Sequence, residues 1–201
     1  MRSHRLLAAL AAATVLGVAG CGDSQDVPGS GLSPTAGNGT DRAFAQAMIP
    51  HHESAVDMAK IAQERGSSAF VMRLADDIVR TQNAEISAMR AADERLQGAG
   101  VAKGSLGVAS HMMGPDDLAT LKKTKSFDRA FMELMIPHHE AAIPMSRAEI
   151  AKGEDAELKK LAQDIITAQQ REIAAMRKEL GKAGAAPTDD MDAEHGGGHS
   201  G

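Results

Sequence analysis

The sequence predicts an all-α fold, a four-helix bundle made from two repeated antiparallel helical hairpins that a long crossover connects. Ala, Met, Leu, Glu, Lys and Arg dominate the chain, and these residues are strong helix formers. No Asn-Gly turn joins alternating runs of Val, Ile and Thr, which argues against a β-sheet. An internal repeat, each copy of which has the pattern of two helices, gives the number of helices and their pairing.

The repeat has a constant offset of 87 residues, so that His138 corresponds to His51. Three segments recur without a gap: Asp-Arg-Ala-Phe at 41–44 and 128–131, Met-Ile-Pro-His-His-Glu at 48–53 and 135–140, and Gln-x-x-Glu-Ile-x-x-Met-Arg at 82–90 and 169–177. Agreement of this length indicates an internal duplication.

Each copy predicts two helices, which in chain order span residues 41–65, 68–97, 128–152 and 155–180. Thr40 or Asp41 is the predicted N-cap of the first helix. The predicted helices end at glycines, namely Gly66, Gly98, Gly153 and Gly181. Because the loops at Gly66 and Gly153 are short, each pair of helices is expected to form an antiparallel hairpin.

The segment between the hairpins is long enough to cross the length of a bundle, and it is expected to include a short helix after Pro115. Two hairpins with one long crossover make a ferritin-like bundle. The predicted bundle covers residues 40–182, with repeats at 41–97 and 128–182 and the crossover at 98–127. Pro50, Pro137 and Pro144 lie inside predicted helices, which they are expected to kink or end early.

Residues 1–20 have the pattern of a signal peptide, with a basic start and an apolar run from Leu6 to Val18. That run spans roughly 20 Å as a helix, which is too short for a bilayer core of about 30 Å. Val-Ala-Gly before Cys21 resembles a bacterial lipobox, which implies cleavage before Cys21 and its diacylation; an ordinary secretory signal is the alternative. We therefore expect an extracytoplasmic protein that Cys21 anchors to the cell membrane. Residues 21–39 have the composition of a flexible tether, and residues 183–201 that of a disordered Gly- and His-containing tail.

The composition argues against several function classes. A net charge of -5 and an aromatic content of 2% give no basis for binding nucleic acid. Motifs such as Gly-x-Ser-x-Gly, the P-loop, His-Glu-x-x-His and Glu-x-x-His are absent, so no enzyme is expected. Cys21 is the only cysteine, so the folded part has no disulfide and no thiolate ligand. The abundant donors that remain are 12 Met and 8 His.

The repeated histidines are predicted to face the core. At about 100° per residue, His51 and His52 lie within the apolar stripe that contains Met48, whereas Glu53 points away. In the second copy His138 and His139 occupy the same places.

The partner helices place Glu85 and Glu172 near the centres of apolar stripes, with Gln82 and Gln169 at the margins. An unpaired carboxylate on a buried face costs several kcal/mol. We therefore expect each glutamate to face the histidine pair or a metal ion that the pair holds.

This donor set favours a soft metal ion, most of all Cu(I) or Ag(I), because thioethers select soft ions and imidazole binds copper readily. The candidate ligands are Met48, His51, His52, Met58, Glu85, His111, Met112, Met113, Met135, His138, His139, Met145 and Glu172. Two alternatives remain open. One is a structural or interaction module with buried His–Glu pairs and methionines, Met89 and Met176 included, that only fill the core. The other is a His/Glu site for Zn(II) or another divalent ion.

The doubled Met-Ile-x-His-His-Glu motif, each copy followed by Gln-x-x-Glu-Ile-x-x-Met, resembles the domain-of-unknown-function 305 family over about residues 40–180. The resemblance implies a ferritin-like bundle outside the cytoplasm and, in some members, copper or silver binding linked to metal tolerance. The Met-rich segment at 111–113 fits the family pattern as well. The chain departs from it at Pro144, which is expected to move Met145 away from the position of its counterpart.

Overall fold

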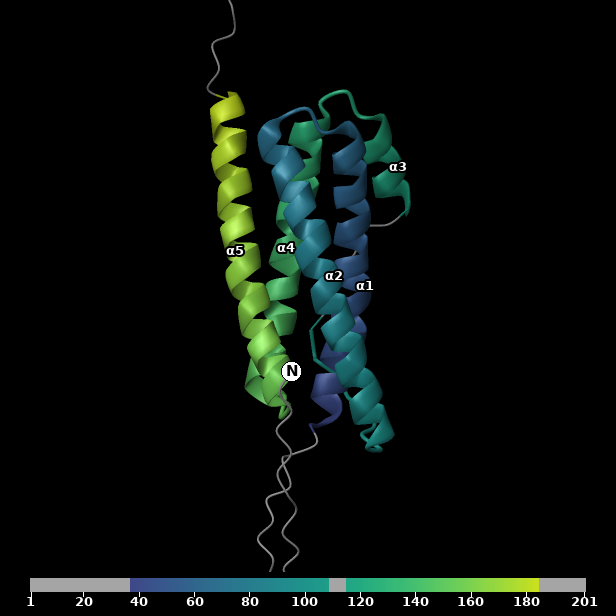
Figure 1. Ribbon diagram of the computed structural model, residues 1–201. Coiled ribbons are helices and arrows are strands. Elements are labelled where there is room, and N and C mark those ends of the chain that lie inside the picture. Colours follow the sequence, from purple (N-terminus) through teal and green to yellow (C-terminus); the bar gives the residue numbers. More distant parts are fainter. Residues whose placement is uncertain (1–36, 109–114, 185–201) are drawn as a thin grey trace, which may run out of the picture. The chain divides into compact units, whose positions relative to one another are not determined.

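The computed structural model describes residues 37–108 and 115–184, and its regular structure there is entirely helical (Figure 1). The helices are α1 (Gly39–Arg65), α2 (Ala69–Gly98), α3 (Pro115–Lys123), α4 (Phe127–Lys152) and α5 (Ala156–Gly184). α1 pairs with α2 and α4 with α5, and the two hairpins pack together along α1 and α4. The predicted all-α bundle of two hairpins and a crossover is therefore confirmed. None of the described helices is long and apolar enough to cross a membrane.

Several predicted features lie outside the described residues. They are the signal peptide at 1–20, Cys21 with most of the tether at 21–39, the donor segment His111, Met112 and Met113, and nearly all of the tail at 183–201. Pro115 begins α3, as expected, and α3 packs against α4 and α1.

The start of α1 differs from the prediction. Asn38, not Thr40 or Asp41, is the N-cap, and its side chain accepts hydrogen bonds from Thr40 N (2.7 Å) and Asp41 N (3.3 Å). Asp41 occupies the third helical position and accepts from Asn38 N, which completes a capping box. Asp41 is then oriented toward the second hairpin.

The helix ends follow the glycine pattern in part. Gly66 and Gly153 end α1 and α4, as predicted, but α5 continues through Gly181 to Gly184. The expected early ends at the prolines are wrong, because α1 continues through Pro50 and α4 through Pro137 and Pro144. An internal proline costs about 3 kcal/mol, and the fully buried faces of these helices offset that cost.

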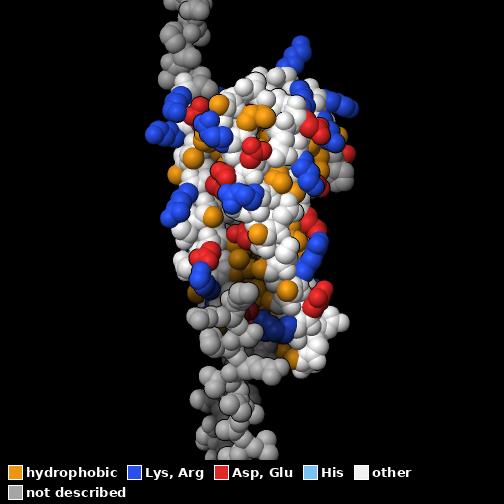
Figure 2. All heavy atoms as spheres, in the orientation of Figure 1, with side chains coloured by type: hydrophobic (Ala, Val, Ile, Leu, Met, Phe, Trp, Pro, Cys, Tyr) orange, Lys and Arg blue, Asp and Glu red, His pale blue; other side chains and the backbone are white. Residues whose placement is uncertain are grey.

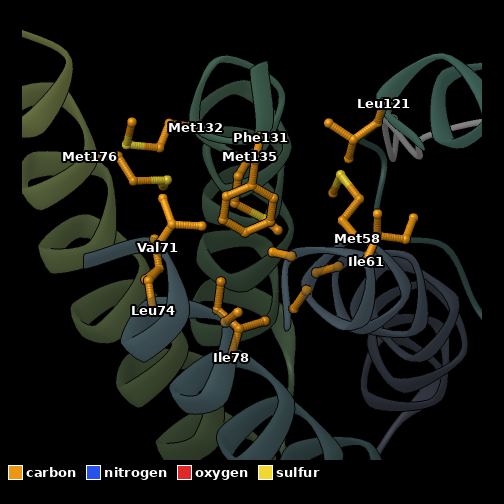
Figure 3. Packing of buried hydrophobic residues seen from close by; sticks show 14 of the residues in the cluster. Met58, Ile61, Val71, Leu74, Ile78, Leu121, Phe131, Met132, Met135 and Met176 are labelled. Carbon is orange, nitrogen blue, oxygen red and sulfur yellow. The ribbon is translucent and has the colours of Figure 1, made fainter. Parts of the chain in front are cut away.

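Two apolar clusters fill the bundle, and each contains residues of both repeats. One cluster includes Met58 of α1 together with Met132 and Met135 of α4 and Met176 of α5. Figure 3 shows these side chains around Phe131, with Leu121 of α3 beside Met58. The other cluster combines Met48 and Met89 of the first repeat with Met145 of the second. The core is therefore shared between the hairpins.

An aspartate at the start of each repeat ties the hairpins together. Asp41 accepts hydrogen bonds from the backbone N–H groups of Glu154 (3.0 Å) and Asp155 (2.9 Å) in the α4–α5 turn. Asp128 does the same with Ser67 N (2.9 Å) and Ser68 N (2.7 Å) in the α1–α2 turn. Each aspartate thus satisfies N–H groups of the turn that precedes the other repeat's second helix.

Candidate metal centre

Four histidines form a continuous row across the interface between α1 and α4. His51, His52 and His139 are completely buried and His138 is 1% exposed. The ring centroids of His51 and His138 are 3.9 Å apart, with the planes inclined by 35°. Within each helix the two neighbouring rings are 6.2 Å apart. The prediction that the motif histidines face the core is confirmed.

A glutamate closes each end of this row. His52 Nε2 lies 2.8 Å from Glu85 Oε2, and His139 Nε2 lies 2.5 Å from Glu172 Oε2. The predicted pairing of each carboxylate with the facing histidines is thus confirmed. The glutamates are partly exposed, 18% for Glu85 and 19% for Glu172, so they are the points at which the buried row reaches solvent.

The His–Glu hydrogen bonds set the chemistry of the outer histidines. A carboxylate only accepts, so Nε2–H of each ring donates, and a neutral ring then has its lone pair on Nδ1. In the part of the chain that the structure describes, Nδ1 of His52 and of His139 is buried and has no hydrogen-bond partner. Metal-binding histidines commonly donate their other ring N–H to a carboxylate in this way. Each outer histidine therefore has the hydrogen-bond arrangement of a metal-binding histidine.

The glutamines of α2 and α5 are more buried than the glutamates, which is the reverse of the prediction. Gln82 and Gln169, expected at the margin, are 3% and 2% exposed, whereas Glu85 and Glu172, expected at the centre, are more exposed. The reason is that α2 packs mainly on α1, and α5 on α4, while α2 and α5 touch each other little. The predicted centre of the apolar stripe on each of these helices is therefore left partly exposed.

The candidate methionines among the described residues are all buried, but not as the sequence grouped them. Met48 and Met58 of one helix lie in different clusters, on opposite sides of the histidine motif, and Met48 shares its cluster with Met145 of the other repeat. Met135 shares the remaining cluster with Met58. Met145, which follows Pro144, is fully buried like its counterpart Met58. Thioethers of both repeats are thus present in the core on each side of the motif.

Among residues 37–108 and 115–184, no three or more His, Cys, Asp or Glu side chains converge in the manner of a metal site. The structure thus gathers the predicted histidines and glutamates into a row and not into a compact cluster.

The outward glutamates behave as predicted. Glu53 and Glu140 are exposed and form ion pairs with Arg90 and Arg177, which lie on the second helix of the same hairpin. These pairs link the helices of each hairpin on its outer surface, beside the residues that face the core.

Sequence reasoning missed a second buried polar group, the side-chain pair of Asp41 and Glu149, both 0% exposed. The pKa of Glu149 is raised to about 9. Burial is the largest cause, followed by the side chain of Asp41 and its negative charge. Burial alone would raise the pKa of Asp41, but hydrogen bonds from Glu149 and from backbone N–H groups lower it. Glu149 is therefore a neutral acid beside the Asp41 carboxylate. The sequence signal was the replacement of Ala62 by Glu149 between the repeats.

Solved structures of other proteins resemble this one. The Cu(I)-bound form of CopM is 33% identical, with 71% of this chain and 96% of that chain covered and a TM-score of 0.60. The Ag-bound form of CopM obtained by soaking is 32% identical, with 71% and 95% covered and the same TM-score. A DUF305 protein from Streptomyces coelicolor is 27% identical, with 73% and 94% covered and a TM-score of 0.65.

A curated relative matches over a shorter stretch. An uncharacterized protein of Acanthamoeba polyphaga mimivirus is 42% identical over 60 residues, which are 29% of this chain and 40% of that protein. The chain therefore matches less than half the length of that relative. The family model described as "Domain of unknown function (DUF305)" matches residues 20–93 and 41–180. This chain is a member of the DUF305 family.

Proposed function

We propose that this protein binds a soft metal ion, Cu(I) or Ag(I), through the buried histidines and the methionines of the core, and that it sequesters or buffers that ion. The observation that carries the proposal is the orientation of His52 and His139. A glutamate fixes Nε2 of each ring, and Nδ1 is buried without a partner among the described residues. No catalytic role is proposed.

The energetics favour a ligand at these atoms. A buried nitrogen acceptor without a hydrogen bond costs about 1–3 kcal/mol, and the arrangement occurs in both repeats. A core that needed only to pack would place apolar side chains at these positions at lower cost. A metal ion bound at Nδ1 supplies the interaction that the protein itself does not.

The choice of a soft ion rests on the buried sulfurs of the core. Met48, Met58, Met135 and Met145 are fully buried in the clusters to which the motif helices contribute. Thioether sulfur favours Cu(I) and Ag(I) over Zn(II). The likeness to CopM, whose solved forms hold Cu(I), Cu(II) or Ag, supports the same choice.

We further propose that the protein acts outside the cytoplasm, anchored to the membrane by a lipid on Cys21. The support is the sequence of residues 1–21, with its basic start, apolar run and lipobox-like end. Changing Cys21 to Ser is expected to release the protein from the membrane fraction of the producing cells. Retention of the Cys21→Ser protein in that fraction would contradict the anchor.

The test of metal binding is an anaerobic Cu(I) titration of the purified protein against a chromophoric chelator. A variant with His51, His52, His138 and His139 changed to Ala is expected to lose binding at the bundle. The matched control changes Glu53 and Glu140 to Gln, next to the same histidines but on the exposed side. Equal binding by the histidine variant and the unchanged protein would overturn the proposal.

A second variant separates the proposal from its two alternatives. Replacing Met48, Met58, Met135 and Met145 by Leu keeps the core volume and removes the sulfurs. Affinity for Cu(I) and Ag(I) is expected to fall, while affinity for Zn(II) is unaffected. If the site instead binds Zn(II) or another divalent ion through His and Glu, these changes should leave the metal affinity unaltered. A purely structural role predicts that metal leaves the melting temperature unchanged.

A further inference from the structure

The face between α2 and α5 contains two grooves related by the internal repeat. The first groove, of about 310 Å³, is lined by Phe70, Arg73 and Leu74 of α2 and by Arg171 and Ala175 of α5, among others. The second groove, of about 280 Å³, is formed by the equivalent parts of the two helices. On the face of the molecule that Figure 2 presents, basic side chains lie beside apolar and acidic ones.

The first groove suits an anionic segment that also carries an apolar side chain. Arg73 and Arg171 border it from different helices, both are exposed, and among the described residues neither guanidinium has an ion-pair or hydrogen-bond partner. The carboxylates that line the same groove are already engaged. Asp77 pairs with Arg80 at 2.7 Å, and Glu172 is hydrogen-bonded to the buried histidine row. Two unpaired cations therefore flank an apolar floor.

The second groove has a different character, although the repeat relates the two. Glu157 takes the place of the phenylalanine, and Ala84 takes that of the arginine on the other helix. Lys160 lines this groove, but it is already paired with Asp164 at 2.5 Å. An acidic segment is therefore attracted to the first groove and not to the second.

The chain that follows α5 has the chemistry that matches the first groove. Residues 185–201 contain no lysine or arginine and four acidic residues: Asp189, Asp190, Asp192 and Glu194. Met191 lies in the middle of this acidic stretch. Because successive side chains of an extended chain point to opposite sides, Met191 can face the floor of the groove while Asp190 and Asp192 face its rims.

The length of the chain after α5 fits the first groove only. Helix α5 ends at Gly184, so Ala175 lies nine residues (184 − 175) before the end, which is about 14 Å along the helix. An extended chain that turns back at Gly184 covers up to about 25 Å by Met191. Leu161 of the second groove lies 23 residues (184 − 161) before the end, about 35 Å away. Met191 can therefore reach the first groove but not the second.

We propose that residues 189–194 dock in the first groove of the same molecule, with their carboxylates on Arg73 and Arg171. Met191 then packs against Phe70. Arginine is the strongest side-chain partner for carboxylates, because its planar fork donates two hydrogen bonds at once. A short linker to α5 gives the segment an effective concentration of about millimolar at the groove, so weak contacts suffice. This inference does not rest on the proposed function.

The test places a single tryptophan in the acidic segment of the full-length protein, which has no tryptophan of its own. Met191→Trp reports the surroundings of position 191, and Ser200→Trp, beyond the acidic stretch, is the matched control. At low salt Met191→Trp is expected to emit at shorter wavelength and to be quenched by acrylamide several-fold less than Ser200→Trp. High salt should reduce this protection, because it screens the exposed charges.

Charge reversal in the groove identifies where the segment binds. In the Met191→Trp protein, changing Arg73 and Arg171 to Glu is expected to raise quenching to the level of Ser200→Trp. The matched control changes Lys160 and Ala84 to Glu, which are exposed and occupy the equivalent positions of the second groove. That control is expected to leave the protection of the tryptophan unchanged.

A rescue variant tests the pairing of charges. Changing Asp190 and Asp192 to Lys in the protein with the two reversed arginines is expected to restore protection, and no recovery would contradict the pairing. Equal quenching of Met191→Trp and Ser200→Trp, or equal losses from reversal in the two grooves, would overturn the docking. Protection that increases with protein concentration would assign the segment to a second copy of the chain and would overturn docking within one molecule.

Discussion

The two repeats have the same centre but different ends. Both centres pair a buried histidine with a glutamate on the neighbouring helix, and both carry an exposed Glu–Arg pair outside it. At the ends, Asp128 is partly buried and the residue equivalent to Glu149 is Ala62, whereas Asp41 is fully buried beside Glu149. The difference teaches that the histidine centre is the same in both copies, whereas only one of the two aspartates that join the hairpins has an ionisable partner.

Gly153 makes this tie possible. A Cβ atom at this position would overlap Glu149 and lie 2.6 Å from Asp41 Oδ1, so only glycine leaves room for both carboxyl groups. At the equivalent Gly66 a Cβ would instead meet the backbone oxygen of Ala62 at 2.6 Å. The two turns therefore need glycine for different reasons, and only one of them surrounds an acid pair.

The largest expected effect is the loss of stability when Asp41 or Asp128, which join the two hairpins, is replaced. Asp41→Asn removes a buried charge that three N–H groups and the Glu149 proton stabilise, and should lower the free energy of unfolding by about 3–5 kcal/mol. Asp128→Asn, at a partly exposed site, should cost only about 1–2 kcal/mol. Urea denaturation of both variants measures the difference, and equal losses would show that Glu149 adds nothing to the first tie.

The next effect is a dependence of stability on pH that comes from one repeat only. The pKa of Glu149 is raised from 4.5 to about 9, so its contribution is complete below pH 4.5 and is lost as the pH rises toward 9. The slope is at most about 1.4 kcal/mol per pH unit, so the protein should lose up to about 3 kcal/mol between pH 6 and 8. Glu149→Gln, which stays neutral, should remove this loss.

The lowered pKa values act in the opposite direction. Asp41, Asp93 and Asp128 all have a pKa below 3.8, so their contributions are present at higher pH and are lost as the pH falls below that value. Stability should therefore be greatest at mildly acidic pH. Urea denaturation between pH 3 and 9 measures the free energy of unfolding on both sides of this maximum. A free energy of unfolding that still rises between pH 6 and 8 in the unchanged protein would contradict the neutral Glu149.

The smallest effect is expected at the exposed pairs. Glu53→Gln and Glu140→Gln each break one ion pair whose members are about half exposed, and such pairs contribute about 0.2–1 kcal/mol. The two changes should be equal, because the surroundings repeat. Thermal unfolding at low and high salt measures them. Unequal losses would indicate that the duplicated surfaces are not equivalent.

Much of the fold follows from periodicity. The offset of 87 residues, the glycines at 66 and 153 and the apolar faces predicted two hairpins, because these signals are local and repeat twice. The helix start at Asn38 was missed because a capping box also involves its third helical residue, Asp41, which itself resembles an N-cap. The prediction that helices end early at the prolines was wrong because the packing of a whole helix face outweighs one missing hydrogen bond.

The site was predictable in its parts but not in its grouping. Helical angles placed His51 and His138 in the core, but they do not reveal that these two rings meet across α1 and α4. The same angles do not show that Met48 packs with Met145, since the antiparallel contact of the repeats decides this. The exposure of Glu85 likewise depends on how little α2 touches α5. Each of these is a property of packing between segments distant in sequence.

The most direct measurement is long-range ¹H–¹⁵N spectroscopy of the histidine-labelled protein with and without Ag(I). In the metal-free protein His52 and His139 should have the proton on Nε2. Addition of Ag(I) should shift their Nδ1 resonances and leave Nε2–H in place, because the glutamates hold that atom. A response confined to histidines that lie beyond the described residues, such as His111, His195 and His199, would contradict a metal site in the buried row.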